Sequence, residues 1–511
     1  MINKLILFGM ILYILFVFHY PDVIAISNTP KDMVYLGQNS YFDPWDVNLY
    51  ISVIKSGQLH GLKLENLYTP IPNTPVYVYT FLTALGVIFK TSNPFLIFHI
   101  SGLAAGIILL LGMFYLVKSL GLSFRKSLLT IFLVSLGGGL GFLGISSADI
   151  ASSAFTFYST FQKAHEAIAT LALISAHILF FKTVTQKFNY SNITLLTISL
   201  ATSLFIYPYF IVSFFLICGL FLVFYYRKKK DFDKYILLVG LAIPSAIVAY
   251  FSASQFIINP SFGNVGNNLS LNIISVILGY GILIPIFIYQ LFWLPKSQIR
   301  SFLSIWFLIT LILAILPFGP GKIFFRGSFF PITLLAVMSL SELFKLKPKL
   351  NKNIVYGVFV LLMLGTSTSI FFSRISESYK NNPWTYMPVE EYKILGFLNN
   401  ETKTKSSVLT FFRLGNQIPA FTHNRVYFGH FLQTPDGSNK INKAAMFIGG
   451  KGSVKEKREF LANNKIDYFI WGQEEENLYE KNNKEGNEIK DLLKTLKIVY
   501  KSANFTIFAT K

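Results

Sequence analysis

Charged side chains are scarce in this sequence, and acidic ones are the scarcest. Only 14% of the 511 residues are charged, and 25 Asp and Glu residues stand against 45 Lys and Arg residues, which gives a formal net charge of +20. Hydrophobic residues make up 53% of the chain, and the mean hydropathy is +0.51. A chain of this length and composition is too apolar for a water-soluble protein. The composition therefore predicts an integral membrane protein.

Cysteine is nearly absent. Cys218, the single cysteine, lies within an apolar run, which excludes a disulfide framework and a thiolate metal site. The positive charge could suggest nucleic acid as a partner, but the basic residues occur in clusters between apolar segments and are not interleaved with aromatic residues. We therefore interpret them as membrane topology signals and expect no nucleic-acid partner.

Apolar segments separated by short loops extend to about residue 370. The run from Met1 to about Ile26 is longer than the core of a signal peptide and lacks a clear cleavage site, so we expect it to be an uncleaved first span. Two later spans must turn near Tyr207-Pro208-Tyr209. With the first span, the following segments predict about eleven transmembrane helices: 95–117, 127–146, 167–182, 192–206, 207–226, 235–256, 271–293, 301–317, 327–344 and 353–372.

Basic residues predict the orientation, because they gather on one side of the assigned spans. We assign that side to the cytoplasm, and the outer loops are then 27–93, 147–166, 257–270 and 318–326. An additional span at 75–90 would reverse every later loop, so we expect Pro75 to Lys90 to form a helix at the outer interface. The basic residues are Lys118, Arg125, Lys126, Lys182, Lys187, residues 227–230, Lys296, Arg300, Lys345, Lys347, Lys349 and Lys352.

The composition changes near Arg374 to a segment rich in Lys, Glu and Asn. The fold class that we predict is a polytopic α-helical membrane protein with a small extracytoplasmic α/β domain. Residues 1–373 would hold the spans and the outer juxtamembrane loop 27–93, and residues 374–511 would form the α/β domain. We expect strands at 407–412, 466–471, 498–500 and 505–508, the last two as a hairpin, and helices at 455–464 and 488–496.

The first outer loop carries Asp43-Pro44-Trp45-Asp46. Asp before Pro at a helix start predicts that Asp43 caps a short helix. Asp46 would then lie in the first turn and share a face with Tyr50, while Trp45 offers an anchor at the membrane interface. A carboxylate on such a helix could also act as a general base. We favour Asp46 for that role and keep Asp43 as the second catalytic candidate.

This layout resembles the type C membrane glycosyltransferases. The resemblance is carried by a first span, an acidic juxtamembrane helix in a long outer loop, a second helix near Pro75-Val76-Tyr77-Val78-Tyr79, many further spans and an outer C-terminal domain. The segment 415–430, followed by Thr434-Pro435-Asp436 and Asp467-Tyr468-Phe469-Ile470, is similar to prokaryotic members of this family. In the family two acidic residues are often adjacent, whereas Pro44-Trp45 separates them here.

The resemblance implies transfer of a sugar, with inversion, from a polyisoprenyl-phosphate donor to a glycan, lipid or protein acceptor at the outer face of the plasma membrane. Asp46 would accept the acceptor's proton. Arg326 and Lys322, at the outer start of a late span, would bind the leaving lipid phosphate. The alternative is that both are snorkelling anchors in membrane lipid.

His165 and Glu166 begin the fourth assigned span from the outer side. They could shape an acceptor pocket or help to hold a divalent cation, or they could be an interfacial pair satisfied by water. We expect His177 to be a packed, hydrogen-bonded histidine. The histidines lack metal-ligand spacing with acidic neighbours, so the sequence predicts no zinc site and no certain cofactor, although a divalent cation at Asp43, Asp46 or Glu166 stays open.

Other motifs favour structural interpretations. We interpret His423, Arg425, Tyr427 and His430 as a turn and a surface that covers a membrane cavity. The glycines at 137–141 lack the strand–turn–helix setting of a nucleotide loop and predict close helix packing or a turn. Residues 227–230 are typical of a stop-transfer flank. The alternative functions are a transporter or flippase, which would more often show repeated halves and buried charges, and a non-catalytic assembly protein for lipid-linked glycans.

Overall fold

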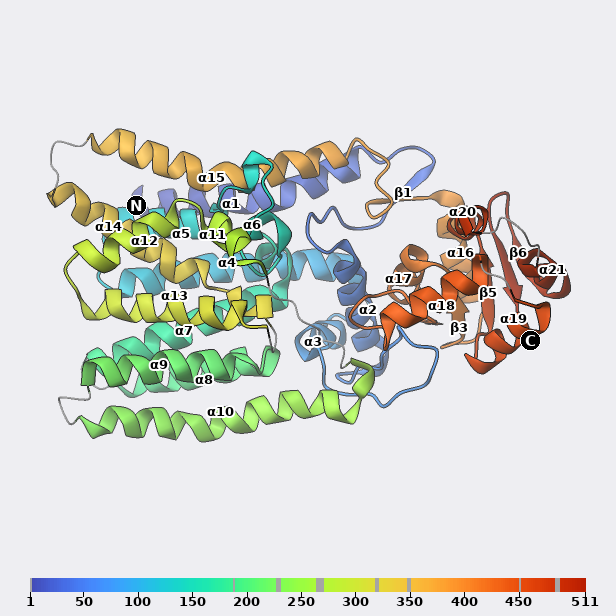
Figure 1. Ribbon diagram of the computed structural model, residues 1–511, viewed down its shortest axis with the longest axis horizontal. Coiled ribbons are helices and arrows are strands. Elements are labelled where there is room, and N and C mark those ends of the chain that lie inside the picture. Colours follow the sequence, from blue (N-terminus) through green and yellow to red (C-terminus); the bar gives the residue numbers. More distant parts are fainter. Residues whose placement is uncertain are drawn as a thin grey trace. The chain divides into compact units, whose positions relative to one another are not determined.

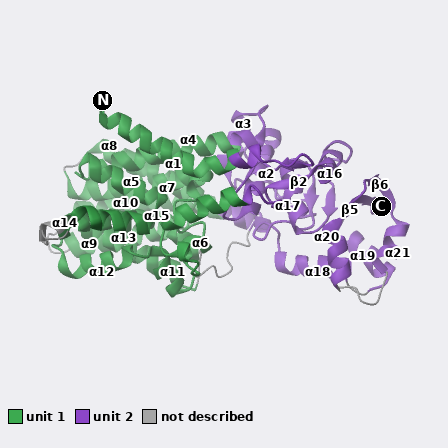
Figure 2. Cartoon of the chain, turned by 90° about the horizontal axis from the view of Figure 1, so that it is seen from above, with its two compact units in different colours: residues 1–23, 98–253, 266–376 green, residues 24–97, 254–265, 377–511 purple. Residues whose placement is uncertain are grey.

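A computed structural model describes residues 2–186, 189–226, 231–262, 271–317, 321–346, 351–449, 452–482 and 488–511. Lys187, Lys347, Lys349 and the basic run 227–230 therefore lie outside the described residues. The chain divides into two compact units, which Figure 2 shows in green and purple. Unit 1 comprises residues 1–23, 98–253 and 266–376, and unit 2 comprises residues 24–97, 254–265 and 377–511.

Unit 1 is helical throughout its described part. Four helices have residues in both units. They are α1, α4, α10 and α15, and most of each belongs to unit 1. The helices of unit 1, with these four, are α1 (Ile2–Ser27), α4 (Pro94–Ser119), α5 (Phe124–Leu136), α6 (Ala148–Ala151), α7 (Ala164–Thr185), α8 (Tyr190–Ile206), α9 (Phe210–Tyr226), α10 (Phe232–Ile258), α11 (Ile273–Tyr280), α12 (Leu283–Trp293), α13 (Gln298–Ile315), α14 (Phe329–Leu346) and α15 (Lys352–Glu377). Short 3-10 turns are η1 (Gly141–Leu143), η2 (Thr160–Gln162) and η6 (Gly321–Phe325).

Each predicted span contains a helix, which confirms a multi-pass membrane protein. Among the described residues, seven helices are long and apolar enough to cross a membrane, or eight if the pair α11 and α12, bent by 86°, counts as one span. Helices α8 and α9 have 17 residues each, and they turn at Tyr207-Pro208-Tyr209 as predicted. The span predicted at 127–146 is wrong over its second half, because α5 ends at Leu136.

The glycine-rich segment after α5 explains that early end. The amide of Gly138 donates to Met363 O, and the amide of Leu140 donates to Leu278 O. A Cβ on Gly139 would lie 2.2 Å from Leu278 O, so only glycine permits this approach. The close packing predicted for residues 137–141 is confirmed. Asp149 closes the turn, because its Oδ2 accepts from the amides of Gly139 and Gly141 at 2.8 and 3.3 Å.

Large apolar side chains on the helix surfaces identify lipid as the solvent of unit 1. Helix α10 exposes a stripe at positions three or four residues apart: Ile236, Val239, Ile243, Ile247 and Tyr250. Such a continuous apolar surface is stable in a bilayer and unstable in water. In the interior, His177 stacks on Trp306 at 4.2 Å between ring centroids, and its Nδ1 lies 2.8 Å from Leu173 O. The expectation of a packed, hydrogen-bonded histidine is confirmed.

The described basic residues lie at helix ends that face one end of unit 1. Lys118 and Lys182 are in the last turns of α4 and α7. Lys126, Arg300 and Lys352 are in the first turns of α5, α13 and α15. The starts of α1 and α15 lie at the same end of the bundle in Figure 1. The orientation prediction depends on such a pattern, in which basic residues lie near the connections between consecutive helices on one side of the bundle.

Unit 2 contains a five-stranded mixed sheet with the order β4-β3-β5-β7-β6. Strand β3 pairs in parallel with β4 and β5, whereas β7 pairs antiparallel with β5 and β6. The predicted strands and terminal hairpin are confirmed, although the first ends at Leu409 and Phe412 begins a helix. The strands are β1 (Met33–Tyr35), β2 (Tyr386–Pro388), β3 (Ser407–Leu409), β4 (Arg425–Val426), β5 (Tyr468–Trp471), β6 (Lys497–Lys501) and β7 (Thr506–Ala509).

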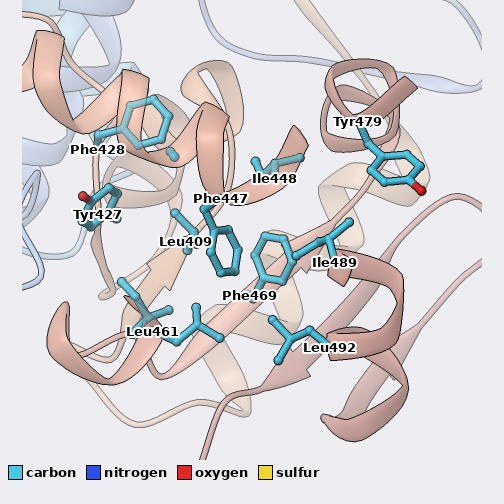
Figure 3. Close-up of a cluster of buried hydrophobic side chains, with 12 residues drawn as sticks. Leu409, Tyr427, Phe428, Phe447, Ile448, Leu461, Phe469, Tyr479, Ile489 and Leu492 are labelled. Carbon is cyan, nitrogen blue, oxygen red and sulfur yellow. The ribbon is translucent and has the colours of Figure 1, made fainter. Parts of the chain in front are cut away.

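Helices pack on this sheet around an apolar core. Figure 3 shows that core, in which Leu409 and Phe469 of the central strands meet Phe447, Leu461 and other buried side chains. The predicted helices 455–464 and 488–496 are confirmed as α19 and α21. The helices of unit 2 are α2 (Pro44–His60), α3 (Thr80–Ile88), α16 (Val389–Asn400), α17 (Phe412–Phe421), α18 (Gly437–Gly449), α19 (Val454–Asn463), α20 (Gln473–Asn482) and α21 (Glu488–Thr495), with the 3-10 turn η4 (Pro260–Phe262).

Two segments of the first outer loop pack together in unit 2. Helices α2 and α3 approach at two glycines, since a Cβ on Gly57 would lie 2.2 Å from Thr83 O and one on Gly86 would lie 2.1 Å from Ile54 O. Helix α3 has nine residues, or about 14 Å of helix, which is too short to cross a bilayer. Helix α2 also packs against α17, beside which it lies in Figure 1.

Glu475 gives unit 2 an expected pH dependence. Burial raises the pKa of its carboxyl from 4.5 to about 7, although Thr410 and the amide of Phe411 donate to it. The folded chain thus holds a proton that the unfolded chain releases between those values. Stability from this group falls as pH rises from about 4.5 to 7, by up to about 3 kcal/mol. We expect the melting temperature of the detergent-solubilised chain to fall over this range, and Glu475→Gln to flatten the decline. Equal slopes in both proteins would contradict this assignment.

Candidate active site

Asp46, the favoured catalytic candidate, lies in a polar cluster of unit 2. It is in the first turn of α2, and the hydroxyl of Tyr50, one turn further, donates to Asp46 Oδ2 at 3.4 Å. The shared face of these two residues is confirmed. On the other side, His430 Nε2 lies 3.0 Å from Asp46 Oδ1. The side chain of Asp46 is 19% exposed and that of His430 only 1%, so the carboxylate is open to a substrate and the imidazole is almost fully covered.

The hydrogen bonds of His430 assign its tautomer. Its Nδ1 accepts from the backbone amides of Leu432 and Gln433, each at 3.2 Å. A nitrogen that accepts carries no proton, so the proton of the neutral ring lies on Nε2 and is donated to Asp46. This bond orients the carboxylate without neutralising it.

Two glycines bring His430 to Asp46. The loop after β4 crosses α17 so closely that a Cβ on Gly429 would lie 2.3 Å from the carbonyl group of Gly415. Thr434 Oγ1 accepts from the amides of Gly429 and His430 at 3.2 Å each, which fixes the backbone at this point. The His430 ring is therefore placed by backbone packing.

Gly429→Ala is expected to disturb this placement. The added methyl group has no space, so the loop must move away from α17, at a cost of about 1–3 kcal/mol. We expect a lower melting temperature and weaker activity, because His430 then leaves Asp46. Gly396→Ala, inside helix α16, where a Cβ meets nothing within 4 Å, is the matched control and is expected to lower neither quantity, since alanine favours a helix. Equal melting temperatures for Gly429→Ala and the unchanged chain would contradict the close packing.

A second layer of polar groups surrounds this pair. The ring of Tyr79 lies 6.1 Å from that of Tyr50, and Gln433 Nε2 donates to the Tyr79 hydroxyl at 3.0 Å. Asn416 Oδ1 accepts from the buried amide of Asn48 at 2.8 Å, which ties α17 to α2. These bonds join the first outer loop to the C-terminal segment within unit 2.

The capping interpretation of Asp43 is wrong. Asp43 occupies the position before α2, but its side chain makes no capping hydrogen bond. Its φ of 48° is in the left-handed region, whereas a capping residue is normally extended, with its side-chain oxygen above the free amides. The cap that Asp-Pro predicts is lost because the preceding loop imposes a different backbone conformation.

The candidates of unit 1 form a separate buried cluster. Arg326 Nη1 forms an ion pair with Glu166, and its guanidinium lies 5.0 Å from the ring centroid of Tyr207. Lys163 Nζ lies 3.7 Å from Glu166 Oε1. His165, in the first turn of α7, is 3% exposed. Lys322 lies in η6, half-buried, four residues before Arg326. Two cations thus face one carboxylate.

The interpretation of residues 423–430 as a covering surface is wrong for three of its four members. His430 is paired with Asp46, the ring of Tyr427 is in the apolar core, and Arg425 forms an ion pair with Glu65. Only the pattern of polar residues was visible in the sequence, and the carboxylates that pair with His430 and Arg425 come from more than 350 residues away. Lys163 was also missed, although its spacing of three from Glu166 on a helix start was a usable signal.

Few metal ligands gather around Asp46. Within the described ranges, no group of three or more His, Cys, Asp or Glu side chains is placed to hold a metal ion. Each oxygen of Asp46 faces a donor, His430 on one side and Tyr50 on the other. The described residues around Asp46 thus supply no ready set of ligands for a divalent cation.

No family model and no curated protein matches the chain. Solved structures show that its fold is that of the type C membrane glycosyltransferases. The oligosaccharyltransferase of Archaeoglobus fulgidus in the apo form is 13% identical, with a TM-score of 0.58, and the match covers 99% of this chain and 74% of that one. ArnT from Cupriavidus metallidurans, bound to undecaprenyl phosphate, is 10% identical, with a TM-score of 0.53 and coverage of 92% and 96%. At these identities the likeness shows the fold alone.

Proposed function

We propose that this chain is a membrane glycosyltransferase that moves a sugar from a polyprenyl-phosphate carrier to a glycan, lipid or protein acceptor. The observation that carries the proposal is the partly exposed Asp46 carboxylate, oriented by His430 and Tyr50, in a chain with the type C fold. The carrier class is supported by two structural neighbours, AglB from Archaeoglobus fulgidus in complex with a dolichol-phosphate and ArnT bound to undecaprenyl phosphate.

In the proposed reaction Asp46 is the general base. Its carboxylate accepts the proton of the acceptor hydroxyl while the oxygen attacks the anomeric carbon. The bond from that carbon to the carrier phosphate breaks, and its electron pair leaves with the phosphate. A single displacement of this kind inverts the anomeric configuration. His430 holds Asp46 in position.

The cluster at Arg326 suits the leaving phosphate. Arg326 and Lys163 carry two positive charges and Glu166 one negative charge, so the trio has a net charge of +1. Arginine binds phosphate through two parallel N–H donors. Glu166 would keep the guanidinium in place before the carrier arrives. We assign Lys322 and His165 to the border of this subsite, and we derive no step that passes through a metal ion.

The proposed site lies outside the cytoplasm. The basic helix ends of unit 1 support this proposal, because the positive-inside rule assigns them to the cytoplasmic side. The first loop and the segment after α15 follow helix ends on the opposite side, so both parts of unit 2 would be extracytoplasmic. The membrane would be the plasma membrane, where carrier-linked sugars are available at the outer leaflet.

The test uses the full chain in lipid nanodiscs with a radiolabelled polyprenyl-phosphate sugar and a mixture of cell-envelope acceptors. We expect label to move from the carrier to an acceptor, and Asp46→Asn to abolish this movement. A carrier that crosses the bilayer without loss of its sugar would support a flippase and would overturn the proposal.

A further inference from the structure

A pocket adjoins the Asp46–His430 pair in unit 2. Its cavity volume is about 150 Å³ and it opens to solvent, which is room for one small ring. His430 forms part of its wall, so the pocket begins one side chain away from the proposed base. The remaining wall comes from the start of α17, the loop after β4 and one face of α18.

Aromatic rings form one side of this pocket. The rings of Phe412 and Phe431 lie 4.4 Å apart between centroids. Trp45, the residue before Asp46, contacts Phe431 at 5.6 Å and Trp384 at 6.1 Å, and Trp384 contacts Phe412 at 6.1 Å. Four rings from four separate segments thus support one another. Phe431 is nevertheless 55% exposed, so much of its side chain stays open to solvent.

The part of the wall that α18 supplies carries polar groups. Ser438, Ile441 and Asn442 have the spacing of one helical face, and all three line the pocket. Ser438 and Asn442 are exposed, so a hydroxyl and an amide share the wall with the phenyl rings. The pocket therefore offers both flat apolar faces and hydrogen-bonding groups.

We infer that this pocket is the acceptor subsite and that it binds a pyranose ring, so that the acceptor is a carbohydrate. One face of a pyranose presents C–H groups, which pack on aromatic rings, and its edge presents hydroxyls, which pair with side chains such as those of Ser438 and Asn442. The inference rests on the proposed function, because it takes the acceptor hydroxyl to be the one that Asp46 deprotonates.

Other acceptor classes fit the pocket less well. An acyl chain would place its methylene groups against the polar face of α18, without partners for Ser438 and Asn442. A peptide that adds to a sheet needs a free edge strand. At β4, the strand nearest the pocket, the amide of Val426 already donates to Leu67 O at 2.9 Å, so this edge is occupied by the chain itself.

The experiment measures binding of methyl pyranosides to the full chain by saturation-transfer NMR. Nanodiscs are used because the sugar headgroups of maltoside detergents would compete. The probes are the methyl glycosides of glucose, galactose, mannose and N-acetylglucosamine. We expect at least one to bind, and Phe431→Ala and Asn442→Ala to weaken it at least fivefold. Met446→Ala, one turn along the exposed side of α18, is the control and is expected to bind as the unchanged chain does.

The outcomes separate this inference from the proposed function. Asp46→Asn is expected to retain glycoside binding while it loses transfer. Three outcomes would overturn the carbohydrate subsite, even if transfer depends on Asp46. In the first, no glycoside binds; in the second, a glycoside binds the Phe431→Ala chain as tightly as the unchanged chain. In the third, a hexapeptide or laurate binds more tightly than any of the glycosides. Transfer that is unaffected by Asp46→Asn would overturn the proposed function, whereas glycoside binding that depends on Phe431 would still establish the pocket.

Discussion

Asp46→Asn is expected to lower the rate of sugar transfer by about 10²–10⁴-fold, the usual contribution of a general base. An amide cannot accept the acceptor's proton, but its oxygen can still accept the N–H of His430, and its NH2 group can donate to the Tyr50 hydroxyl oxygen. The cluster should therefore keep its geometry, and the melting temperature should stay close to that of the unchanged chain. The measurement is the initial rate of label transfer in nanodiscs, together with thermal unfolding of the same samples.

Two further variants make this prediction specific. Asp32→Asn changes an exposed carboxylate of the same outer loop and is expected to leave the rate unchanged. Asp43→Asn compares the two carboxylates of the Asp-Pro-Trp-Asp segment, and we expect a smaller loss than at Asp46. A larger loss at Asp43 than at Asp46 would transfer the role of base to Asp43. An unchanged rate in both variants would remove the segment from catalysis.

Arg374→Met is expected to cause the largest loss of stability. The Arg374 side chain is 1% exposed, and it donates to Asp22 at 2.9 Å and to Phe18 O at 2.6 Å. Removal of the guanidinium takes the arginine partner from the buried Asp22 carboxylate, which costs about 3–5 kcal/mol. We expect a marked fall in the melting temperature of the detergent-solubilised chain.

A double variant tests the cause. Asp22→Leu combined with Arg374→Met removes both charges and is expected to recover much of the lost stability, because no unpaired charge remains. Lys380→Met is the control, since it breaks the exposed ion pair with Glu377, where Lys380 is 62% exposed, at a cost of about 0–1 kcal/mol. A double variant as unstable as Arg374→Met would show that packing, not charge, explains the loss.

Local patterns were sufficient for most of the secondary structure. The terminal hairpin and α19 follow from short-range spacing, and the structure has both where they were predicted. The span at 127–146 failed because the glycines at 137–141 bind carbonyl groups of α11 and α15, and no local pattern contains those partners. The cap expected at Asp43 failed for a similar reason, since the loop before α2 sets its backbone angles.

The sequence by itself determined that this is a multi-pass membrane protein with a small α/β sheet, because apolar length and strand alternation are properties of neighbouring residues. It also selected Asp46 and Tyr50 as one face of a helix, because that spacing is local. The tertiary structure alone decided that His430, from 384 residues away, orients Asp46, and that Phe412 and Phe431 form a pocket beside it. Contacts of this kind depend on how segments that are distant in the sequence pack together, as at Gly415 and Gly429. A local sequence pattern therefore cannot predict them.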